Sequence, residues 1–310
     1  MNNQTKNILL RNTLEFMGYE KIIEKINRNE TINGYWGISP DKNIDISCII
    51  PLLKLRDYIF LNFNMIVFIA DVHAFLIKGN QWNDRTTERT EYYKFVISEI
   101  LNLLNVNDQY SFVLGSNVQL DKRYIVDLFK LLTYIDVNEA KQSSADIINY
   151  SDKTILSNLI YPIMQIIDET VLDVHIEIGC IDQKKIFELS EKYIEKLNYD
   201  KCSYSITDIL KFDKIYFTDS DDIIKSKILS RKCTFNDDCH FNNLVKLLLY
   251  PLDIKYPECE TYQKFNDQYC NKKITEDNIR IWICVSIINL ISPIRTKLIN
   301  NKLYENAFYQ

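Results

Sequence analysis

The chain has 310 residues, and its 46% hydrophobic and 25% charged content is typical of a soluble globular protein. It contains no low-complexity run or internal repeat, and no window reaches the apolar length of a membrane span. The first residues, Met-Asn-Asn-Gln-Thr-Lys, form no apolar signal segment. We therefore expect a cytoplasmic protein with reduced thiols and no membrane partner.

Charge is unevenly distributed along the chain. The formal net charge is −5, but residues 225–310 carry 13 Lys and Arg against 9 Asp and Glu, which leaves a balance of −9 for residues 1–224. A basic C-terminal part suits an anionic partner. An ordinary solvated surface would explain this small excess equally well, so charge gives only support to a nucleic-acid partner.

Hydrophobic periodicity predicts strands and helices that alternate up to about residue 218, after which the pattern is almost wholly helical. The predicted elements are a helix at 7–26, a buried strand at 65–75, a helix at 92–106, strands at 111–115 and 171–179, and helices at 183–197, 241–249 and 279–298. We expect Pro293 to kink the last helix. The alternation predicts an α/β fold, with a Rossmann-like parallel sheet in residues 1–222 and a smaller all-helical domain in residues 223–310.

Three polar residues share one face of a predicted helix. Tyr161, Gln165 and Asp168 fall at positions i, i+4 and i+7, and their neighbours are mostly apolar. Burying such groups without hydrogen-bond partners costs about 1–3 kcal/mol each. Either they satisfy one another and the backbone, or a bound small polar molecule supplies the partners.

These residues belong to a longer pattern. Tyr161-Pro-Ile-Met-Gln165-Ile-Ile-Asp168, followed by Gly179-Cys-Ile-Asp-Gln183-Lys-Lys-Ile-Phe187, resembles the tyrosine pocket of archaeal- and eukaryotic-type tyrosyl-tRNA synthetases. Further segments match this family in the same order, at 34–37, 51–57, 68–76, 92–93, 115–120 and 290–298. The last of them resembles part of the family's anticodon-binding domain, which the helical part of the chain would represent.

The resemblance gives five residues a role in binding L-tyrosine. Tyr35 and Asp168 would hold the phenolic hydroxyl, and Tyr161, Gln165 and Gln183 would hold the α-ammonium. A buried carboxylate that accepts the phenol O–H would also reject phenylalanine, because loss of that hydroxyl leaves the carboxylate unpaired.

The ATP side departs from the family pattern. When Gly37 and Pro51 are aligned on their counterparts, Asp45-Ile-Ser-Cys48 takes the place of the family's H-V-A/G-Y element, so Asp45 replaces its histidine. A carboxylate there would repel the negative charge that develops during adenylation. The preceding loop, 40–44, contains no glycine to let the backbone approach a phosphate.

Other ATP-side features are also altered. Cys180 replaces a second glycine after Gly179, and His175 and Glu177 replace residues that are commonly Asp and Gln or Val. Only 15 residues separate Tyr199 from Ile215, which is too few for a mobile lysine-bearing K-M-S-K-S loop. Substitutes for its lysines would be Lys225-Ser226-Lys227, Lys211 or Lys214.

Two further features invite a functional reading. Asp71 and His73 follow the predicted strand at 65–75, and ligands in parallel sheets bind at the carboxyl ends of strands; a histidine packed in a satisfied turn is an equally good reading. Cys233, Cys239 and His240 come nearest to a zinc motif, but we expect no metal site, because the eight cysteines form no C-x-x-C pair.

Two functions fit this pattern. The first is a synthetase-like protein that binds L-tyrosine and tRNA, with adenylation impaired or lost and no cofactor. It would act as a homodimer or as a dimer with a related synthetase, because the family dimerises through its Rossmann domains. The second is an active tyrosine–tRNA ligase that uses ATP with Mg²⁺ and non-standard residues.

Overall fold

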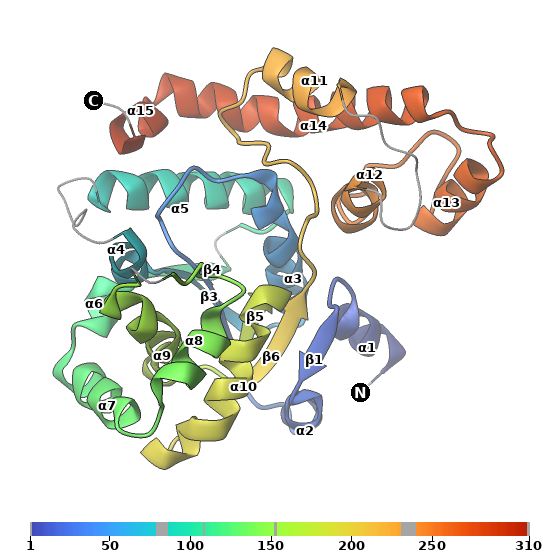
Figure 1. The fold of residues 1–310 in the computed structure, drawn as a ribbon. Coiled ribbons are helices and arrows are strands. Elements are labelled where there is room, and N and C mark those ends of the chain that lie inside the picture. The colour runs from blue at the N-terminus through green and yellow to red at the C-terminus, as the bar shows by residue number, and fades with distance from the viewer. Residues whose placement is uncertain (1, 79–85, 108, 152–153, 231–239, 309–310) are drawn as a thin grey trace.

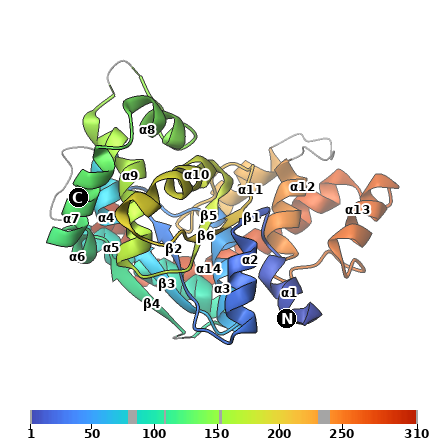
Figure 2. The same ribbon diagram turned by 90° about the horizontal axis from the view of Figure 1, so that it is seen from below.

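The computed structural model describes residues 2–78, 86–107, 109–151, 154–230 and 240–308 (Figure 1). A six-stranded sheet with helices on both faces forms the N-terminal body, and the remaining helices lie at one end of it (Figures 1 and 2). The strands are β1 (Glu15–Met17), β2 (Asn33–Ile38), β3 (Asn64–Ile69), β4 (Tyr110–Leu114), β5 (Ile176–Cys180) and β6 (Ser203–Thr207). The predicted fold class, a Rossmann-like α/β domain with a helical part, is confirmed.

The order of the strands explains where a ligand can bind. They run β1-β6-β5-β2-β3-β4, with β1 antiparallel to β6 and all other neighbours parallel. From β2 the chain crosses to β3 on one side, and from β5 it crosses to β6 on the other side. The crevice beyond the carboxyl ends of β2 and β5 is therefore the topological switch point at which ligands bind in such sheets.

Helices connect the parallel strands and cover both faces of the sheet. They are α3 (Ile49–Phe60), α4 (Asp71–Lys78), α5 (Thr86–Leu103), α6 (Ser116–Gln119), α7 (Lys122–Leu132), α8 (Val137–Ser144), α9 (Leu156–Val171) and α10 (Lys184–Tyr193), with short 3₁₀ turns η1 (Ile46–Cys48) and η2 (Ile181–Gln183). Helices α6 to α9 follow β4 and precede β5 in the chain (Figure 1), and α9 forms a wall at the switch point.

The N-terminal segment differs from the single helix expected at 7–26. It consists of α1 (Asn3–Leu10), β1 and α2 (Tyr19–Asn27). Helix α1 ends where Lys54, fully buried in α3, donates to the carbonyl of Leu9 at 2.6 Å. Gly18 then turns the chain with φ +71°, and a Cβ there would lie 2.8 Å from Ser203 Oγ. Tertiary contacts thus override a helical period in the sequence.

Two predicted strand boundaries are also wrong. The apolar run expected to be one strand at 65–75 contains the end of β3 at Ile69 and the start of α4 at Asp71. The strand expected at 171–179 begins only at Ile176, because α9 continues to Val171 and Asp173 adopts φ 50°. A continuous apolar run fits a buried strand and a buried helix equally well, so period alone could not find the first boundary.

The C-terminal part is helical, as predicted. It contains α11 (Asp221–Leu229), α12 (His240–Leu244), a π-helical segment (Val245–Leu249), α13 (Tyr262–Cys270), α14 (Glu276–Asn300) and α15 (Leu303–Phe308). Helix α14 runs through Pro293. We propose that this part begins at Asp221, two residues before the predicted boundary, because α11 lies along α14 (Figure 1).

Helix α14 alone among the described helices has the length and apolar composition of a membrane span. The expectation that no segment has the apolar length of a membrane span is therefore wrong. Its buried residues form a stripe along one face, with Ile279, Ile283, Ile287 and Ile291 four residues apart, and they belong to the main hydrophobic core. Such a stripe is typical of a core helix of a globular protein.

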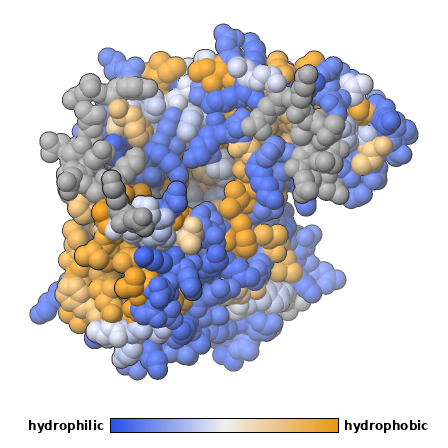
Figure 3. Space-filling model, in the orientation of Figure 1, coloured by the Kyte–Doolittle hydropathy of each residue, from blue (hydrophilic) through white to orange (hydrophobic). Residues whose placement is uncertain are grey.

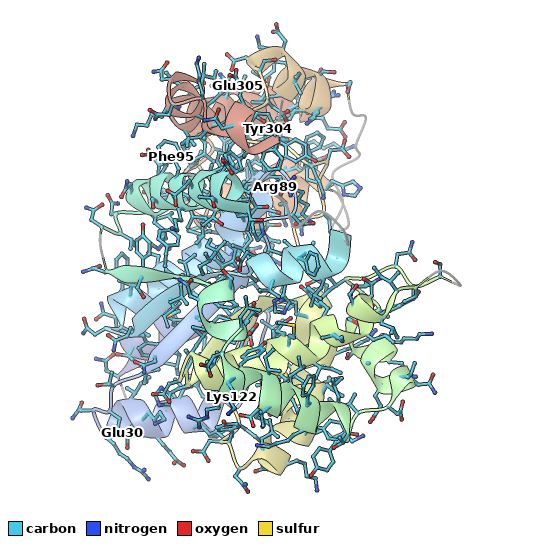
Figure 4. All side chains as sticks on the ribbon, turned by 90° about the vertical axis from the view of Figure 1, so that its left-hand side faces the viewer. Glu30, Arg89, Phe95, Lys122, Tyr304 and Glu305 are labelled. Carbon is cyan, nitrogen blue, oxygen red and sulfur yellow. The ribbon has the colours of Figure 1, made fainter. Side chains whose placement is uncertain are left out.

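The helical part packs tightly on the sheet domain. Arg295 of α14 donates to the carbonyl of Asp219 and to Asp221, both at 2.5 Å. Tyr304 of α15 contacts Tyr92 of α5 with ring centroids 5.8 Å apart. Figure 4 shows Tyr304 beside Arg89 and Phe95 of α5 at this junction. One hydrophobic core extends through both parts.

A substitution at Gly179, near the end of β5, can test how closely β5 packs against α10. A Cβ there would lie 2.3 Å from Cζ of Phe187, a buried ring stacked on Tyr204 with centroids 4.4 Å apart. We expect Gly179→Ala to lower the free energy of unfolding by about 1–3 kcal/mol, as overpacked cores do. Chemical denaturation of both proteins measures the difference.

Gly37 provides the control for this substitution. Its added Cβ would meet its nearest neighbour, Tyr35, at 3.5 Å, which is an ordinary contact. Gly37→Ala should therefore leave stability nearly unchanged. Equal stability of the Gly179→Ala and Gly37→Ala variants would contradict the close packing of β5 against α10.

Candidate functional site

A small cavity lies at the switch point of the sheet. It has a volume of about 40 Å³. Its walls come from the ends of β2, β3 and β5, from α4 and from α9. The lining residues are Tyr35, Gly37, Ile38, Ser39, Phe68, Ala70, His73, Tyr161, Gln165, Asp168, Glu177 and Gln183. The five residues predicted to bind one ligand are all among them.

Asp168 is the most elaborately held polar group of the cavity. Its side chain is buried, and Oδ1 accepts hydrogen bonds from Gln119 Nε2 and from the Tyr124 hydroxyl, both at 2.8 Å. Burial raises the pKa of Asp168 well above its usual range, and these two hydrogen bonds oppose the rise. The second oxygen, Oδ2, is left to face His73.

The network around Asp168 also sets the state of His73. Gln119 Nε2 lies 3.1 Å from His73 Nδ1, and since the amide nitrogen can only donate, Nδ1 accepts and Nε2 carries the proton. Nε2 lies 3.7 Å from Asp168 Oδ2. Burial lowers the pKa of His73 to about 4, so the ring is neutral at pH 7.

Tyr35 and Glu177 lie side by side on neighbouring strands. They are register partners in the β2–β5 pairing, so their side chains leave the same face of the sheet. Both are 1% exposed. Among the described residues, neither the Tyr35 hydroxyl nor Glu177 Oε2 has a hydrogen-bond partner. The other oxygen, Glu177 Oε1, accepts a hydrogen bond from Gln165 Nε2 at 2.8 Å.

Tyr161 and Gln183 form another part of the cavity wall. The Tyr161 ring packs edge-on against His73, with centroids 4.8 Å apart. Burial, and then the charges of Asp41, Asp182, Asp168 and Glu177, raise the pKa of the Tyr161 hydroxyl. Gln183 Oε1 accepts the backbone N–H of Cys180 at 2.9 Å. The charges that act on this part of the wall are therefore negative.

The cavity is small for an aromatic ligand. A cavity of roughly 150 Å³ is known to hold a benzene ring, several times the volume of this one. A phenol ring can enter only if lining side chains rotate. Polar atoms without partners at Tyr35, His73 and Glu177 remain available to a ligand that opens the cavity.

Asp45 has a local structural role. Its carboxylate accepts hydrogen bonds from the Ser47 backbone N–H at 2.9 Å and from the Ser47 hydroxyl, so it caps the turn η1 that leads into α3. Cys48 follows as a buried residue, and burial raises the pKa of its thiol. Residues 44–46 are fixed from the other side, because Ile46 N–H donates to the carbonyl of Ile215 at 2.9 Å.

The loop before Asp45 is also tied down. The Tyr93 hydroxyl donates to the carbonyl of Lys42 at 2.5 Å, and Tyr92 hydrogen-bonds to the side chain of Asn43. Asn43 Nδ2 donates to Thr218 Oγ1 at 2.7 Å. These contacts hold the segment against α5 and the segment after β6, and they engage the Lys42 carbonyl and the Asn43 side chain.

The remaining predicted ATP-side residues are scattered. Asp71 Oδ1 accepts the Ser116 backbone N–H at 2.7 Å, which holds the start of α6. Gly37 and His73 line the cavity described above. Cys180 Sγ lies 3.5 Å from the Thr207 hydroxyl, and burial raises the pKa of the thiol to about 12. Gly179 packs against Phe187.

The lysines predicted to substitute for those of the K-M-S-K-S loop do not line the cavity. Lys225 and Lys227 belong to α11, which Figure 1 shows beside α14 at the far end from α9. Lys227 pairs with Asp219 at 2.6 Å and donates to the carbonyl of Lys214 at 2.7 Å. The carbonyl of Lys211 contacts His240. Cys233 and Cys239 of the candidate zinc motif lie outside the described residues.

Comparison with known proteins decides the family. The model for the tRNA synthetases of class I (W and Y) matches residues 27–217, well over half of the chain. The chain belongs to this family. A probable cytoplasmic tyrosine–tRNA ligase of Encephalitozoon cuniculi is 28% identical over 94% of both chains. The cytoplasmic tyrosine–tRNA ligase of Saccharomyces cerevisiae is 29% identical over 88% of this chain and 78% of its own.

A search of solved structures finds the same kind of protein. The crystal structure of tyrosyl-tRNA synthetase complexed with L-tyrosine from Archaeoglobus fulgidus aligns with a TM-score of 0.86 at 23% identity, covering 96% of this chain and all of that one. The predicted resemblance to tyrosyl-tRNA synthetases is therefore confirmed. Within this synthetase fold, the predicted tyrosine-side residues meet in one cavity, whereas the predicted ATP-side residues do not.

Three residues of the site were not predicted. Gln119 lies in a segment that matches the family but has no predicted role in binding. Glu177 is predicted only as a departure from the family pattern, and Tyr124 has no predicted role. Gln119 and Tyr124 lie on two different helices, and their approach to Asp168 depends on how α6 and α7 pack against α9. No local sequence pattern encodes that convergence.

The state of His73 can be tested by titration. Because burial lowers its pKa to about 4, we expect its ring resonances in NMR to titrate near pH 4. The chain has only three histidines, so the His73→Gln variant assigns the signal. A midpoint near pH 6.5 would contradict the burial of the neutral ring.

The free energy of unfolding should depend on pH through the protonation of His73. The unfolded state binds a proton at about pH 6.5 and the folded state at about 4, so His73 contributes stability above pH 6.5 that is lost as the pH falls toward 4. This contribution amounts to about 3 kcal/mol. His73→Gln should remove this part of the pH dependence, as shown by the difference between the two unfolding curves.

Proposed function

We propose that the cavity binds L-tyrosine. Tyr35 and Asp168 take the phenolic hydroxyl, and Tyr161, Gln165 and Gln183 take the α-ammonium. Support comes from the convergence of all five side chains on one cavity and from the tyrosine-bound synthetase of the same fold. The observation that carries the proposal is Asp168, a buried carboxylate with one oxygen engaged by Gln119 and Tyr124 and the other facing the cavity wall.

A phenol suits this arrangement. The hydroxyl of a phenol both donates and accepts, so it can donate to Asp168 and accept from the unpartnered Tyr35 hydroxyl. The neutral His73 beside Asp168 cannot compete as a cation. A ligand without the hydroxyl would leave two buried polar groups unsatisfied, which costs about 1–3 kcal/mol for each.

We propose further that adenylation is impaired or lost. In this family the start of α3 lies against the ATP phosphates, and here the carboxylate of Asp45 already accepts the hydrogen bonds of the first turn. A phosphate would have to displace this carboxylate and would then be repelled by it. The lysines considered for the missing loop, Lys225 and Lys227, are engaged in ion pairs in α11.

The alternative is an active tyrosine–tRNA ligase that uses ATP and Mg²⁺ with non-standard residues. The names of its relatives favour this alternative, since this chain aligns with 94% of one protein named as a probable tyrosine–tRNA ligase and with 78% of another named as a tyrosine–tRNA ligase. Burial raises the pKa of Asp182, and the charge of Lys42 opposes this rise; the active ligase would need a cation such as Lys42 to meet a phosphate.

We propose tRNA as a partner, and a homodimer or a dimer with a related synthetase as the assembly. The class of the family and the basic balance of residues 225–310 support tRNA. Apolar side chains exposed on the surface support dimerisation: they gather at the left of Figure 3, where Figure 1 shows α6 and α7. They include Leu120, Val126, Phe129, Leu132 and Val137. Exposed apolar surface of this kind marks protein–protein contacts.

Substitution of Asp168 tests the tyrosine site. We expect the protein to bind L-tyrosine at least ten-fold more tightly than L-phenylalanine, because a hydrogen bond to a charged group contributes about 1.5–3 kcal/mol. Asp168→Ala should reduce this preference to near unity. Isothermal titration calorimetry with both amino acids measures it.

Asp127 offers a matched control. It is also a buried aspartate, but its carboxylate pairs with Lys130 at 2.7 Å and with Tyr199, outside the cavity. Asp127→Ala should leave the ratio of the two affinities unchanged. If Asp168→Ala binds tyrosine as tightly as the native chain does, the assignment of the cavity is wrong.

Tyrosine-dependent ATP–pyrophosphate exchange tests the loss of adenylation. Removal of one group that stabilises such a transition state lowers the rate by about 10²–10³-fold. We therefore expect exchange at least about 10²-fold below that of the Saccharomyces cerevisiae tyrosine–tRNA ligase measured in parallel. Exchange at the level of that enzyme would establish the active ligase instead.

A further inference from the structure

Glu177 is a buried carboxyl group of the cavity to which neither the predicted roles nor the family match assigns a function. It lies in β5 between β2 and β6, is 1% exposed and lines the cavity. The titratable groups that face it are Tyr161, Asp168 and Glu169 from α9, Tyr35 from β2, and Tyr204 and Cys202 from β6. No cation is among them.

Glu177 determines which way the amide of Gln165 points. A carboxyl oxygen accepts hydrogen bonds, and Glu177 Oε1 accepts from Gln165 Nε2 at 2.8 Å. The amide nitrogen is therefore turned toward β5, and Gln165 Oε1 is directed away from it. An ammonium group carries only donors, so Gln165 can serve it only through that oxygen.

Glu177 also differs from the two carboxylates beside it. Asp168 is held by Gln119 and Tyr124, and Glu169 accepts from the Tyr204 hydroxyl at 3.0 Å and from Ser190 at 3.1 Å. In Glu177, by contrast, the buried Oε2 has no hydrogen-bond partner among the described residues. Glu169 is thus satisfied within the protein, whereas Glu177 Oε2 and Asp168 Oδ2 are each left without a hydrogen bond in the part of the chain that the structure describes, and Glu177 Oε2 is the fully buried one of the two.

The cavity has no positive charge to balance these groups. Among the described residues that line it, none is Lys or Arg, and His73 is neutral. A carboxylate in such surroundings is costly unless a cation joins it. A ligand that brings an ammonium group would supply that cation.

We propose that Glu177 is a positioning and specificity-determining residue of the tyrosine site: it fixes Gln165 with the amide oxygen toward the ligand and supplies the negative charge that selects an α-ammonium. This inference rests on the proposed binding of tyrosine. It implies that the site favours a ligand with a free amine over the same ligand without it.

The test compares two ligands and one isosteric substitution. We use calorimetry with L-tyrosine and with 3-(4-hydroxyphenyl)propionate, which lacks the amine. Glu177→Gln cannot ionise when the ammonium binds, and its amide can donate to Gln165 Oε1, so in the complex a carboxylate no longer fixes the orientation of Gln165. We expect this variant to bind tyrosine about 10- to 100-fold more weakly and the deaminated ligand within about two-fold of the native protein.

The control is Glu188→Gln. Glu188 is exposed on α10, so this variant makes the same chemical change outside the cavity and should bind both ligands as the native chain does. An equal loss of affinity for both ligands in Glu177→Gln, or no loss for either, would overturn the role of Glu177. If the native chain binds neither ligand, the proposed tyrosine site fails first, and this inference fails with it.

A second readout requires no variant. Burial raises the pKa of Glu177 to about 8, so the carboxyl is largely protonated at pH 7, and a neighbouring ammonium favours its ionised form. Tyrosine binding at pH 7 should therefore release protons, whereas the deaminated ligand should release none. The dependence of the binding enthalpy on the ionisation enthalpy of the buffer counts these protons. Equal release with both ligands would contradict the proposal even if the variant does not fold.

Discussion

The burial of Asp168 is the constraint on which the site depends. Its carboxylate lies 2% exposed inside the protein, and such a group is tolerated only when donors surround it. Gln119 and Tyr124 provide them from α6 and α7, and Gln119 also fixes the tautomer of His73. One carboxylate thus orders three helices around the cavity. These hydrogen bonds fix the orientation of Asp168 at the end of the cavity that we propose for the phenol.

The two sides of the predicted site differ because their polar groups have different partners. On the tyrosine side, polar atoms of Tyr35, His73 and Glu177 are buried without partners, so a ligand can gain hydrogen bonds there. On the nucleotide side, Asp45 caps η1, Asp71 holds the start of α6, and the loop at 41–43 is bonded to α5. Groups already paired in the protein offer little to a phosphate. This difference is the physical reason for which we propose a loss of adenylation.

The sequence predicted what local spacing and motif order can encode. Helical spacing was enough to place Tyr161, Gln165 and Asp168 on one face, and the alternation of elements was enough for the α/β class. The break in the N-terminal helix depends on Lys54 reaching the end of α1 from another helix, so no local period contains it. From the sequence, Glu177 is only a departure from the family pattern on its strand. Its importance arises only when β2, β6 and α9 enclose it, which is a property of the fold.

The sign of the charge connects these observations. Asp168 and Glu177 place carboxyl groups in the wall of the cavity, the charges of Asp41 and Asp182 act on Tyr161, and Asp45 places a carboxylate at the start of η1. An α-ammonium would gain from these groups and would favour the ionised form of Glu177, whereas a triphosphate would be repelled by those that are ionised. The replacement of the family's histidine by Asp45 and the presence of Glu177 therefore act in the same direction. Under the proposed function, both changes favour binding of an amine ligand and disfavour its activation by ATP.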